Sequence, residues 1–444
     1  MPRTVKLLPL LLLASLVAIA PASAENDVPE YRSSDNLGLV AHIPGAGGTD
    51  IEFFTRELRV WKDAEGTVHE IPEEEPPVTR HFAMVGNRLA PTGSNAGPMS
   101  GGAKIVDITD PESPFIAGAV RECWADQGDI QIRADGMLAG IAKQGGTCRF
   151  DDGTSVVHGA ILVDISDPYD PTILSVAPDS RGAHNITFHP SGDYVYISSS
   201  GDTPNHVPIY DITDPTTPTK VKDLVFPDGN SPHDIRFSED GTRAYAAGIN
   251  RFRIINTENP ANPSTIVTFQ VPGSTIGHDT LITPDKRFLF AGEELNGGST
   301  APCPGGAVYV YDLLNEAEPE LLGAVWAESG PVTGRNATEA FAGGVGGCTS
   351  HVIDLNPDKR SFTIGWYVSG TRTFDFSALY DAAGNPAPAP ALSWGSLGAG
   401  PVKEDGWIVP NGGNTWSAKQ YAGVPGYIFS DDLVHGFYVT KITL

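Results

Sequence analysis

The 444-residue chain is poor in basic residues, cysteine and methionine. Lys and Arg number 29 against 54 Asp and Glu, which gives a formal net charge of −25 at pH 7. Such a charge repels phosphate groups, so it argues against non-specific binding to DNA, RNA or an anionic lipid surface. It favours solubility, and cationic ligands or metal ions, and we expect no nucleic-acid partner.

Long apolar runs and helical periodicity are lacking after the first two dozen residues. No later apolar stretch is long enough to span a membrane, so no membrane span is predicted. The absence of a sustained helical period excludes a solenoid of helix pairs. No HExxH motif occurs, and no GxSxG elbow or Walker loop stands in the context that its chemistry requires.

The N-terminus has the pattern of a secretory signal peptide. A basic start precedes an apolar run over residues 7–20, and the small residues Pro21–Ala24 precede Glu25. This order is typical of a cleaved export signal, and the apolar run is short for the alternative, an uncleaved membrane anchor. We predict a signal peptide at 1–24, a linker at 25–35, and a secreted, extracytoplasmic protein.

The most informative feature that is present is an internal repeat. Four segments share a layout of short apolar stretches separated by Gly-, Asp- and Pro-rich turns, and they begin at His184, His233, His278 and His351. Asp-Gly and Ser-Gly supply the positive φ that tight hairpins need, and paired prolines mark strand edges. Four strands in about 40 to 50 residues is the pattern of a β-propeller blade.

Aligning the innermost strands predicts seven units, which begin at Asp50, Asp129, His184, His233, His278, His351 and Thr415. The last unit has three strands, and we expect Asn36–Pro44 to supply the fourth, because this closes the ring without an open edge. The predicted fold is all-β: a seven-bladed β-propeller of four-stranded antiparallel blades, forming one domain over 36–444. Insertions are expected at about 58–78 and 381–410.

A block with the sequence DI[TS]DP recurs after the third strands of successive units. It lies within Val106–Pro114, Leu162–Pro171 and Ile209–Pro218. With the C-terminal segments Asn414–Ala418 and Asp432–Val439, these blocks make the chain resemble the LVIVD-repeat family of secreted bacterial β-propellers. The resemblance covers most of the chain and implies the architecture, but the family has no single biochemical role to carry over.

Four cysteines in an exported chain suggest two disulfides, for which sequence alone allows three pairings. The unit map places the cysteines after second or outer strands, in loops that open on the same face of a propeller. We therefore predict the pairs Cys123–Cys148 and Cys303–Cys348. The alternative is a thiolate metal site, and the absence of CxxC spacing counts against it.

Four histidines occupy one equivalent position in four consecutive units: His184, His233, His278 and His351. Each opens an innermost strand, so we expect them on one arc around the central channel. Imidazole is the usual protein ligand of copper, iron and zinc, which makes the arc a candidate site for one such ion. Glu293 and Glu294, after a second strand, are candidate partners that would orient the imidazoles.

Other interpretations of these side chains stay open. The histidines would equally suit hydrogen bonds within their own blades or a polar channel rim, and Asp234 and Asp279 would then serve local turns. Four tryptophans in the last third would suit either a carbohydrate or peptide groove or the packing between blades: Trp366, Trp394, Trp407 and Trp416.

The function expected from the sequence is that of a binding module at the cell envelope or outside the cell. Its partner would be an unknown protein or small ligand at the channel face. One alternative is a metal-dependent enzyme, redox or oxygenase-like, that uses the four histidines as ligands. A second alternative is a structural scaffold. No catalytic residue is identified, and no cofactor is expected beyond a copper, iron or zinc ion.

Overall fold

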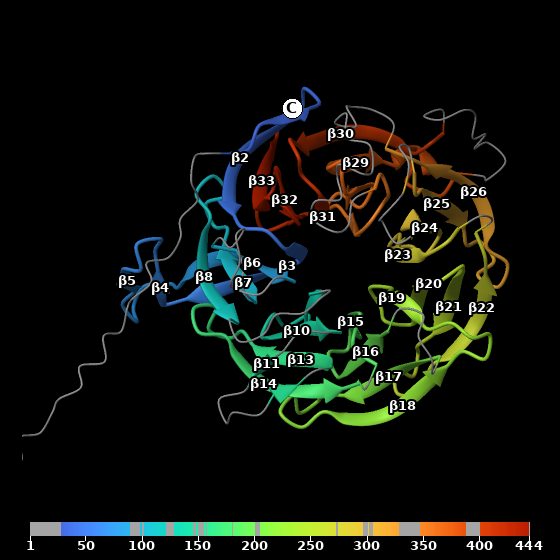
Figure 1. Cartoon of the computed structure of the whole chain (residues 1–444), viewed down its shortest axis with the longest axis horizontal. Helices are drawn as coiled ribbons and strands as arrows, with labels where there is room; N and C mark the ends of the chain where they lie inside the picture. Colours follow the sequence, from blue (N-terminus) through green and yellow to red (C-terminus); the bar gives the residue numbers. More distant parts are fainter. Residues whose placement is uncertain are drawn as a thin grey trace, which may run out of the picture.

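The computed structural model describes residues 28–88, 98–99, 102–120, 128–144, 148–149, 155–156, 158–179, 181–199, 205–271, 274–295, 301, 305–327, 347–387 and 400–443. The predicted signal peptide at 1–24 lies outside the described residues. The described part folds into seven antiparallel sheets, which stand like blades around a common axis (Figure 1). The prediction of an all-β, seven-bladed propeller is therefore confirmed.

Each blade is a meander that runs from the axis to the rim. The first three blades are β3 (Gly48–Leu58), β6 (Val78–Asn87), β7 (Ala103–Asp107) and β8 (Phe115–Val120); β9 (Ile130–Ile132), β10 (Leu138–Lys143), β13 (Gly159–Asp164) and β14 (Thr172–Pro178); and β15 (Asn185–Phe188), β16 (Tyr194–Ser198), β17 (His206–Asp211) and β18 (Thr219–Val225).

The next two blades are β19 (Pro232–Phe237), β20 (Arg243–Gly248), β21 (Arg251–Asn256) and β22 (Ser264–Phe269); and β23 (Gly277–Ile282), β24 (Phe288–Glu293), β25 (Val308–Asp312) and β26 (Glu320–Val325). The sixth blade is β27 (Ile353–Leu355), β28 (Ser361–Gly365), β29 (Thr371–Asp375) and β30 (Lys403–Pro410), with the short 3₁₀ helix η3 (Ser377–Leu379) after β29. All seven predicted unit starts fall within an innermost strand or up to two residues before one.

The seventh blade joins the two ends of the chain. Its strands β31 (Thr415–Gln420), β32 (Tyr427–Asp432) and β33 (Gly436–Ile442) are completed at the rim by β2 (Leu37–Pro44). Leu37 lies opposite Ile442, and Pro44 lies opposite Gly436. The expected ring closure is therefore present. An unexpected strand, β1 (Tyr31–Ser33), lies in the segment predicted as a linker and adds a fifth strand to the sixth blade beside β30.

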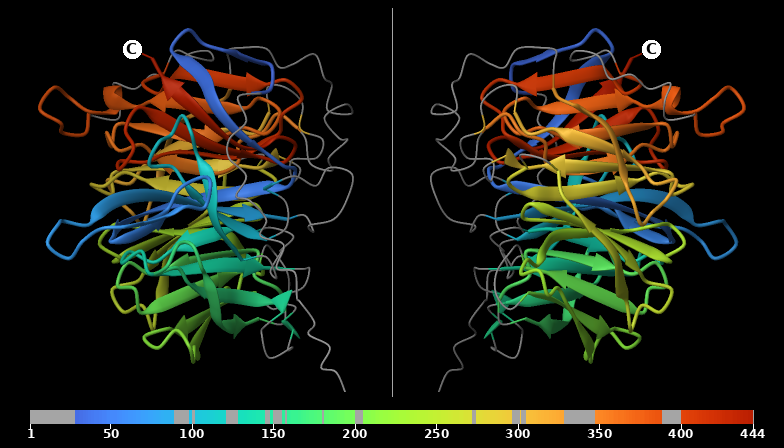
Figure 2. Two further views of the ribbon diagram at one scale, coloured as in Figure 1. Left: turned by 90° about the vertical axis from the view of Figure 1, so that its left-hand side faces the viewer. Right: turned by 90° about the vertical axis from the view of Figure 1, so that its right-hand side faces the viewer.

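The first expected insertion is present in the structure, whereas the second is shorter than expected. Strands β4 (Val60–Lys62) and β5 (Val68–Glu70) form an extra hairpin that projects beyond the ring, as both views show (Figures 1 and 2). The second segment, 381–410, contains the outer strand β30, so that excursion ends before Lys403. A further short hairpin, β11 (Cys148–Arg149) with β12 (Ser155–Val156), lies within the second blade.

The apolar core lies between the faces of neighbouring blades. Strands β23 and β24 are buried at every position, because each face of a blade is covered by the next blade. Phe290 and Phe362, from adjacent blades, have ring centroids 5.2 Å apart, and Trp366 is fully buried in the same cluster. Complete burial of a side chain such as Phe contributes about 1.5–3 kcal/mol, so these contacts fix the blades around the axis.

Buried carboxylates also join the innermost strands of neighbouring blades. Asp129 accepts a hydrogen bond from the Ile186 amide at 2.9 Å, across the boundary between the second and third blades. Asp279 accepts one from the Ile353 amide, also at 2.9 Å, in the sixth blade. The interpretation of Asp279 as a local-turn residue is therefore wrong, because its carboxylate bonds the backbone of the next blade.

The cysteine pairing is tested only in part. Cys348 is buried and disulfide-bonded, and no described cysteine is free. Cys123 and Cys303 lie outside the described residues, so the two pairs stay predictions. No helix in the described part of the chain is long and apolar enough to cross a membrane.

Candidate metal centre

The four histidines of the register converge at the axis, where they form one continuous cluster. The ring centroids of His184 and His233 lie 4.1 Å apart, those of His233 and His278 lie 4.2 Å apart, and those of His278 and His351 lie 3.9 Å apart. All four side chains are buried. The cluster follows from the repeat, since each histidine opens or immediately precedes an innermost strand and consecutive blades bring these positions together.

Hydrogen bonds at both ends of the arc cross blade boundaries. His184 Nε2 lies 2.7 Å from His233 Nε2, and its Nδ1 lies 2.8 Å from the Gln144 side-chain oxygen in the second blade. At the other end, His351 Nδ1 donates to the Trp416 carbonyl of the seventh blade at 2.9 Å. The interpretation of bonds within the same blade is therefore wrong for His184 and His351.

A second set of side chains reaches the cluster from the loops that follow second strands. Gln144 follows β10, Glu294 follows β24, and Tyr367 comes shortly after β28. The Tyr367 hydroxyl donates to Glu294 Oε1 at 2.6 Å, and the Tyr367 ring lies 4.6 Å from that of His351. The loops after second strands thus place an amide, a carboxylate and a phenol around the imidazoles.

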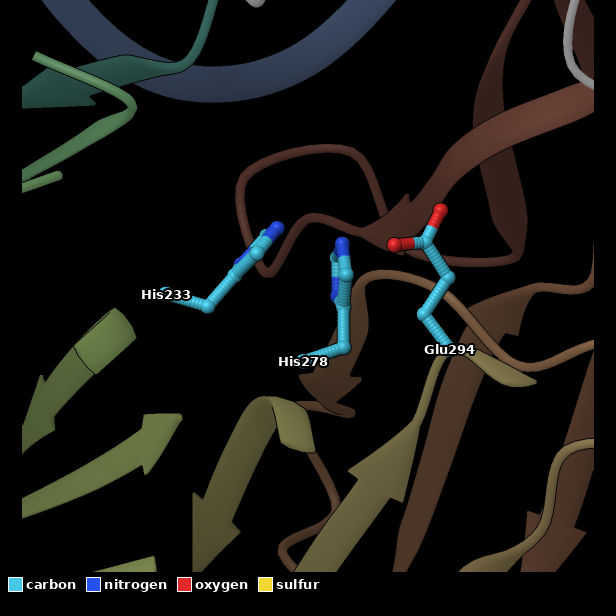
Figure 3. A group of neighbouring side chains, drawn as sticks. All are labelled: His233, His278 and Glu294. Carbon is cyan, nitrogen blue, oxygen red and sulfur yellow. The ribbon is translucent and has the colours of Figure 1, made fainter. Parts of the chain in front are cut away.

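Three of these side chains have donor atoms close enough to share an ion. One ligand atom each from His233, His278 and Glu294 lies within 4.8 Å of the others, and Figure 3 shows the Glu294 carboxylate beside the His278 ring. Ligand atoms about 2.1 Å from one metal ion are at most about 4.2 Å apart. Shifts of about half an ångström would therefore bring these donors into a common coordination sphere.

Burial keeps the imidazoles neutral. It lowers the pKa of His233 to about 4 and lowers the pKa values of His184, His278 and His351 well below their usual range. Positive charge on neighbouring histidines lowers the pKa values of His184 and His278 further. At neutral pH each ring therefore offers an uncharged nitrogen, which is the form that binds a metal ion.

The pKa values of Glu294 and Tyr367 are raised, whereas those of the histidines are lowered. Burial raises the pKa of Glu294 to about 7, and the hydrogen bond from Tyr367 opposes that shift. Burial, and then the charge of Glu294, raise the pKa of Tyr367 well above its usual range. The phenol is thus a hydrogen-bond donor at neutral pH, and it holds one oxygen of the carboxylate in place.

The backbone at Tyr367 is strained. Its φ of 39° lies in the left-handed region, which is uncommon for a bulky aromatic residue. The conformation is held by hydrogen bonds that the Tyr367 carbonyl accepts from the amides of Gly370 at 2.9 Å and Thr415 at 3.0 Å. Strain of this kind concentrates at functional sites, and here it accompanies the placement of the phenol beside Glu294.

The structure separates the two glutamates that the sequence places together. Glu294 lies in the cluster, whereas Glu293 accepts hydrogen bonds from the Thr275 amide at 2.9 Å and the Tyr309 hydroxyl at 3.2 Å. Sequence reasoning missed several contributors at the same level of the channel: Arg88, Gln144, Tyr367 and, in this role, Trp416. Three of them share one signal with Glu294, a position just after a second strand.

The fold and this site define a class, a seven-bladed β-propeller with a histidine cluster at its axis. A family model for the LVIVD repeat matches residues 187–223, which cover most of the third blade. The chain thus contains an LVIVD repeat within a seven-bladed β-propeller, which supports the resemblance that the recurring DI[TS]DP blocks predict. No curated protein matches it in sequence.

Solved structures share the architecture at low sequence identity. A putative 6-phosphogluconolactonase from Bacteroides uniformis is similar with a TM-score of 0.52 and 12% identity, over 79% of this chain and 88% of that one. The β-propeller domain of Cps50 (Swd1) from Myceliophteria thermophila is similar with a TM-score of 0.50 and 12% identity, over 88% of this chain and 100% of that one. At such identities the likeness shows the fold alone.

Proposed function

We propose that this protein is a metal-binding β-propeller, in which His184, His233, His278 and His351 hold one copper, iron or zinc ion. The bound ion would in turn bind a small ligand at the channel. The observation that carries the proposal is the contact of four buried, neutral imidazoles from four consecutive blades. The predicted export signal adds that the protein works outside the cytoplasm.

The cost of the arrangement supports a role beyond packing. The buried Nδ1 atoms of His233 and His278 have no hydrogen-bond partner in the described part of the chain, and each such polar group costs about 1–3 kcal/mol. An ion bound by the imidazoles removes that cost, because the nitrogen lone pairs become ligands. It also stabilises the folded chain by mass action, since the ligand set does not exist in the unfolded state.

The surrounding residues fit a metal ion. The Gln144 oxygen fixes His184, and the Trp416 carbonyl fixes His351, in the manner of the outer partners that orient metal-binding imidazoles. Glu294, held by Tyr367, offers a carboxylate oxygen within reach of the same ion. Imidazole with carboxylate suits iron, copper and zinc. A bound ion would supply Lewis-acid or redox chemistry to a ligand that approaches this centre.

Elemental analysis of untagged protein tests the proposal. The wild type, reconstituted with copper, iron or zinc and then desalted, is compared with the double variant His233→Ala/His278→Ala. His69→Ala is the matched control, because His69 is a partly exposed histidine in the β4–β5 hairpin. We expect about one equivalent of one metal in the wild type and the control, and its loss in the double variant.

Two results would overturn the metal site. One is a wild type that retains no metal after reconstitution, and the other is a double variant that retains as much as the wild type while its circular dichroism is unchanged. Either result would leave the histidines as a polar channel rim. After the first result the protein would be a metal-free binding module, the function that the sequence alone favours. After the second result the metal would be bound elsewhere in the chain.

A further inference from the structure

Arg88 lies beside the Trp416 ring, which in turn contacts His351 of the histidine cluster. It directly follows β6 of the first blade, where its amide donates to the Gly47 carbonyl at 2.9 Å. Its guanidinium carbon lies 5.7 Å from the centroid of the Trp416 ring, which in turn lies 4.3 Å from the His351 ring. Arg88 thus stands beside the arc, on one of the three blades where the histidine register is absent.

This guanidinium has no carboxylate partner among the described residues. That is unusual in a chain with 54 acidic and 29 basic residues, where comparable arginines are paired: Arg181 with Asp179, and Arg253 with Asp228. The side chain is also only half-buried, so its donor groups remain open to a ligand.

An unpaired guanidinium is a disadvantage to a site that holds a cation alone. A divalent ion on four neutral imidazoles and the guanidinium would repel each other, and such repulsion is strong where water is excluded. An anion placed between them reverses the sign of the interaction, because it binds the ion and accepts hydrogen bonds from the planar guanidinium. An unpaired guanidinium beside a metal site therefore favours the binding of a negatively charged ligand.

We propose that the ligand of this centre is a small carboxylate or other oxyanion, held between the histidine-bound metal ion and the Arg88 guanidinium, with the Trp416 ring beside it. This inference rests on the proposed metal site and names the class of molecule that the site receives. The net charge of −25 repels anions from the surface in general, so selection of an anion requires a local cationic pair of this kind.

Cobalt(II) is a suitable probe, because its visible absorption responds to a new ligand whatever the native metal is. The cobalt-loaded wild type, Arg88→Met and Arg88→Lys are titrated with acetate and with azide. We expect Arg88→Met to weaken both anions by about 10- to 100-fold, the effect of losing a charged hydrogen bond. Arg88→Lys should give an intermediate loss, since it keeps the charge but not the planar fork.

Arg251→Met is the matched control, because Arg251 is paired with Asp228 at the side of the fourth blade. It should leave anion binding unchanged. In the absence of an anion, Arg88→Met should bind cobalt at least as tightly as the wild type, since a repulsive charge is removed. A purely structural role for Arg88 over Trp416 would not produce that gain.

The outcomes separate the two proposals. One equivalent of cobalt in all variants, with equal anion affinity in wild type and Arg88→Met, overturns the anion inference and leaves the metal site standing. A wild type that binds no cobalt overturns the metal site, and the anion inference falls with it. Loss of cobalt in Arg88→Met with an intact fold would make Arg88 a structural support of the histidines and would also overturn the inference.

Discussion

The Nε2 atoms of His184 and His233 lie 2.7 Å apart across the boundary between two blades. At that distance one nitrogen donates and the other accepts, so one ring carries its proton on Nε2. The arrangement excludes protonation of both Nε2 atoms, because two N–H donors would then face each other. A cation other than the proton, bound by both lone pairs, is the alternative way to satisfy the pair, and it is the basis of the metal proposal.

Metal addition should stabilise the wild type but not the histidine variant. Free metal at 100 times the dissociation constant adds about 2.7 kcal/mol to the free energy of unfolding, provided that the unfolded chain does not bind. Urea unfolding with and without the metal measures this, and a chelator should reverse it. An equal gain in His233→Ala/His278→Ala would place the stabilising ion elsewhere.

Tyr367→Phe should destabilise the protein. The change removes the 2.6 Å hydrogen bond to Glu294 and leaves a buried carboxyl oxygen without its donor, which costs about 1–3 kcal/mol. Tyr311→Phe is the control, because the buried Tyr311 hydroxyl has no hydrogen-bond partner among the described residues. Its free energy of unfolding should stay the same or rise. Equal losses in both variants, measured by urea unfolding, would show that the phenol of Tyr367 does not support Glu294.

The contribution of Glu52 to stability should fall as the pH rises from 5 to 8. Burial raises the pKa of Glu52 to about 7, while Lys419 opposes the shift and the charges of Asp50 and Asp354 add to it. A carboxyl whose pKa is higher in the folded state stabilises the fold at low pH, and this contribution is lost as the pH passes through 7. Asp129 and Asp234, whose pKa values burial also raises, act in the same direction. The four buried histidines, whose pKa values burial lowers, act in the opposite direction, so the Glu52 contribution is measured as a difference between two proteins.

Glu52→Gln should therefore remove this contribution, so the Tm of the wild type minus that of the variant should fall between pH 5 and pH 8. Thermal unfolding at a series of pH values measures the difference. The sign is specific, because an ion pair with an ordinary carboxylate would make stability rise with pH over the acidic range. A Tm difference between the two proteins that rises or stays constant from pH 5 to pH 8 would contradict the assignment.

Ring closure by the N-terminal strand should be essential for stability. Ile43 of β2 is fully buried in the cluster between the seventh and first blades, so Ile43→Ala should cost about 2–5 kcal/mol. Val225→Ala, at a residue with 61% of its surface exposed, is the control and should be within about 0.5 kcal/mol of the wild type. A loss below about 1 kcal/mol at Ile43, by urea unfolding, would show that the seventh blade does not depend on β2.

The sequence by itself determined the seven blades, their strand order and the closure of the ring. Hairpin turns and strand alternation are local patterns, so they can be recognised in each unit separately. Because the same patterns recur in every unit, each unit supports the prediction made for the others. The histidine arc was predictable for the same reason, because a position repeated in consecutive units must fall at one level of the channel. Strand β30 was missed, since the Pro- and Gly-rich excursion expected over 381–410 includes its residues, Lys403–Pro410.

Only the tertiary structure decided which side chains accompany the histidines. Glu293 and Glu294 are neighbours in the chain, but successive residues at a strand end point in opposite directions, so one bonds Tyr309 and the other joins the cluster. Gln144, Tyr367 and Arg88 come from separate blades, far apart in the sequence. They meet the imidazoles because the blades radiate from one axis and bring the ends of their second strands to the same face.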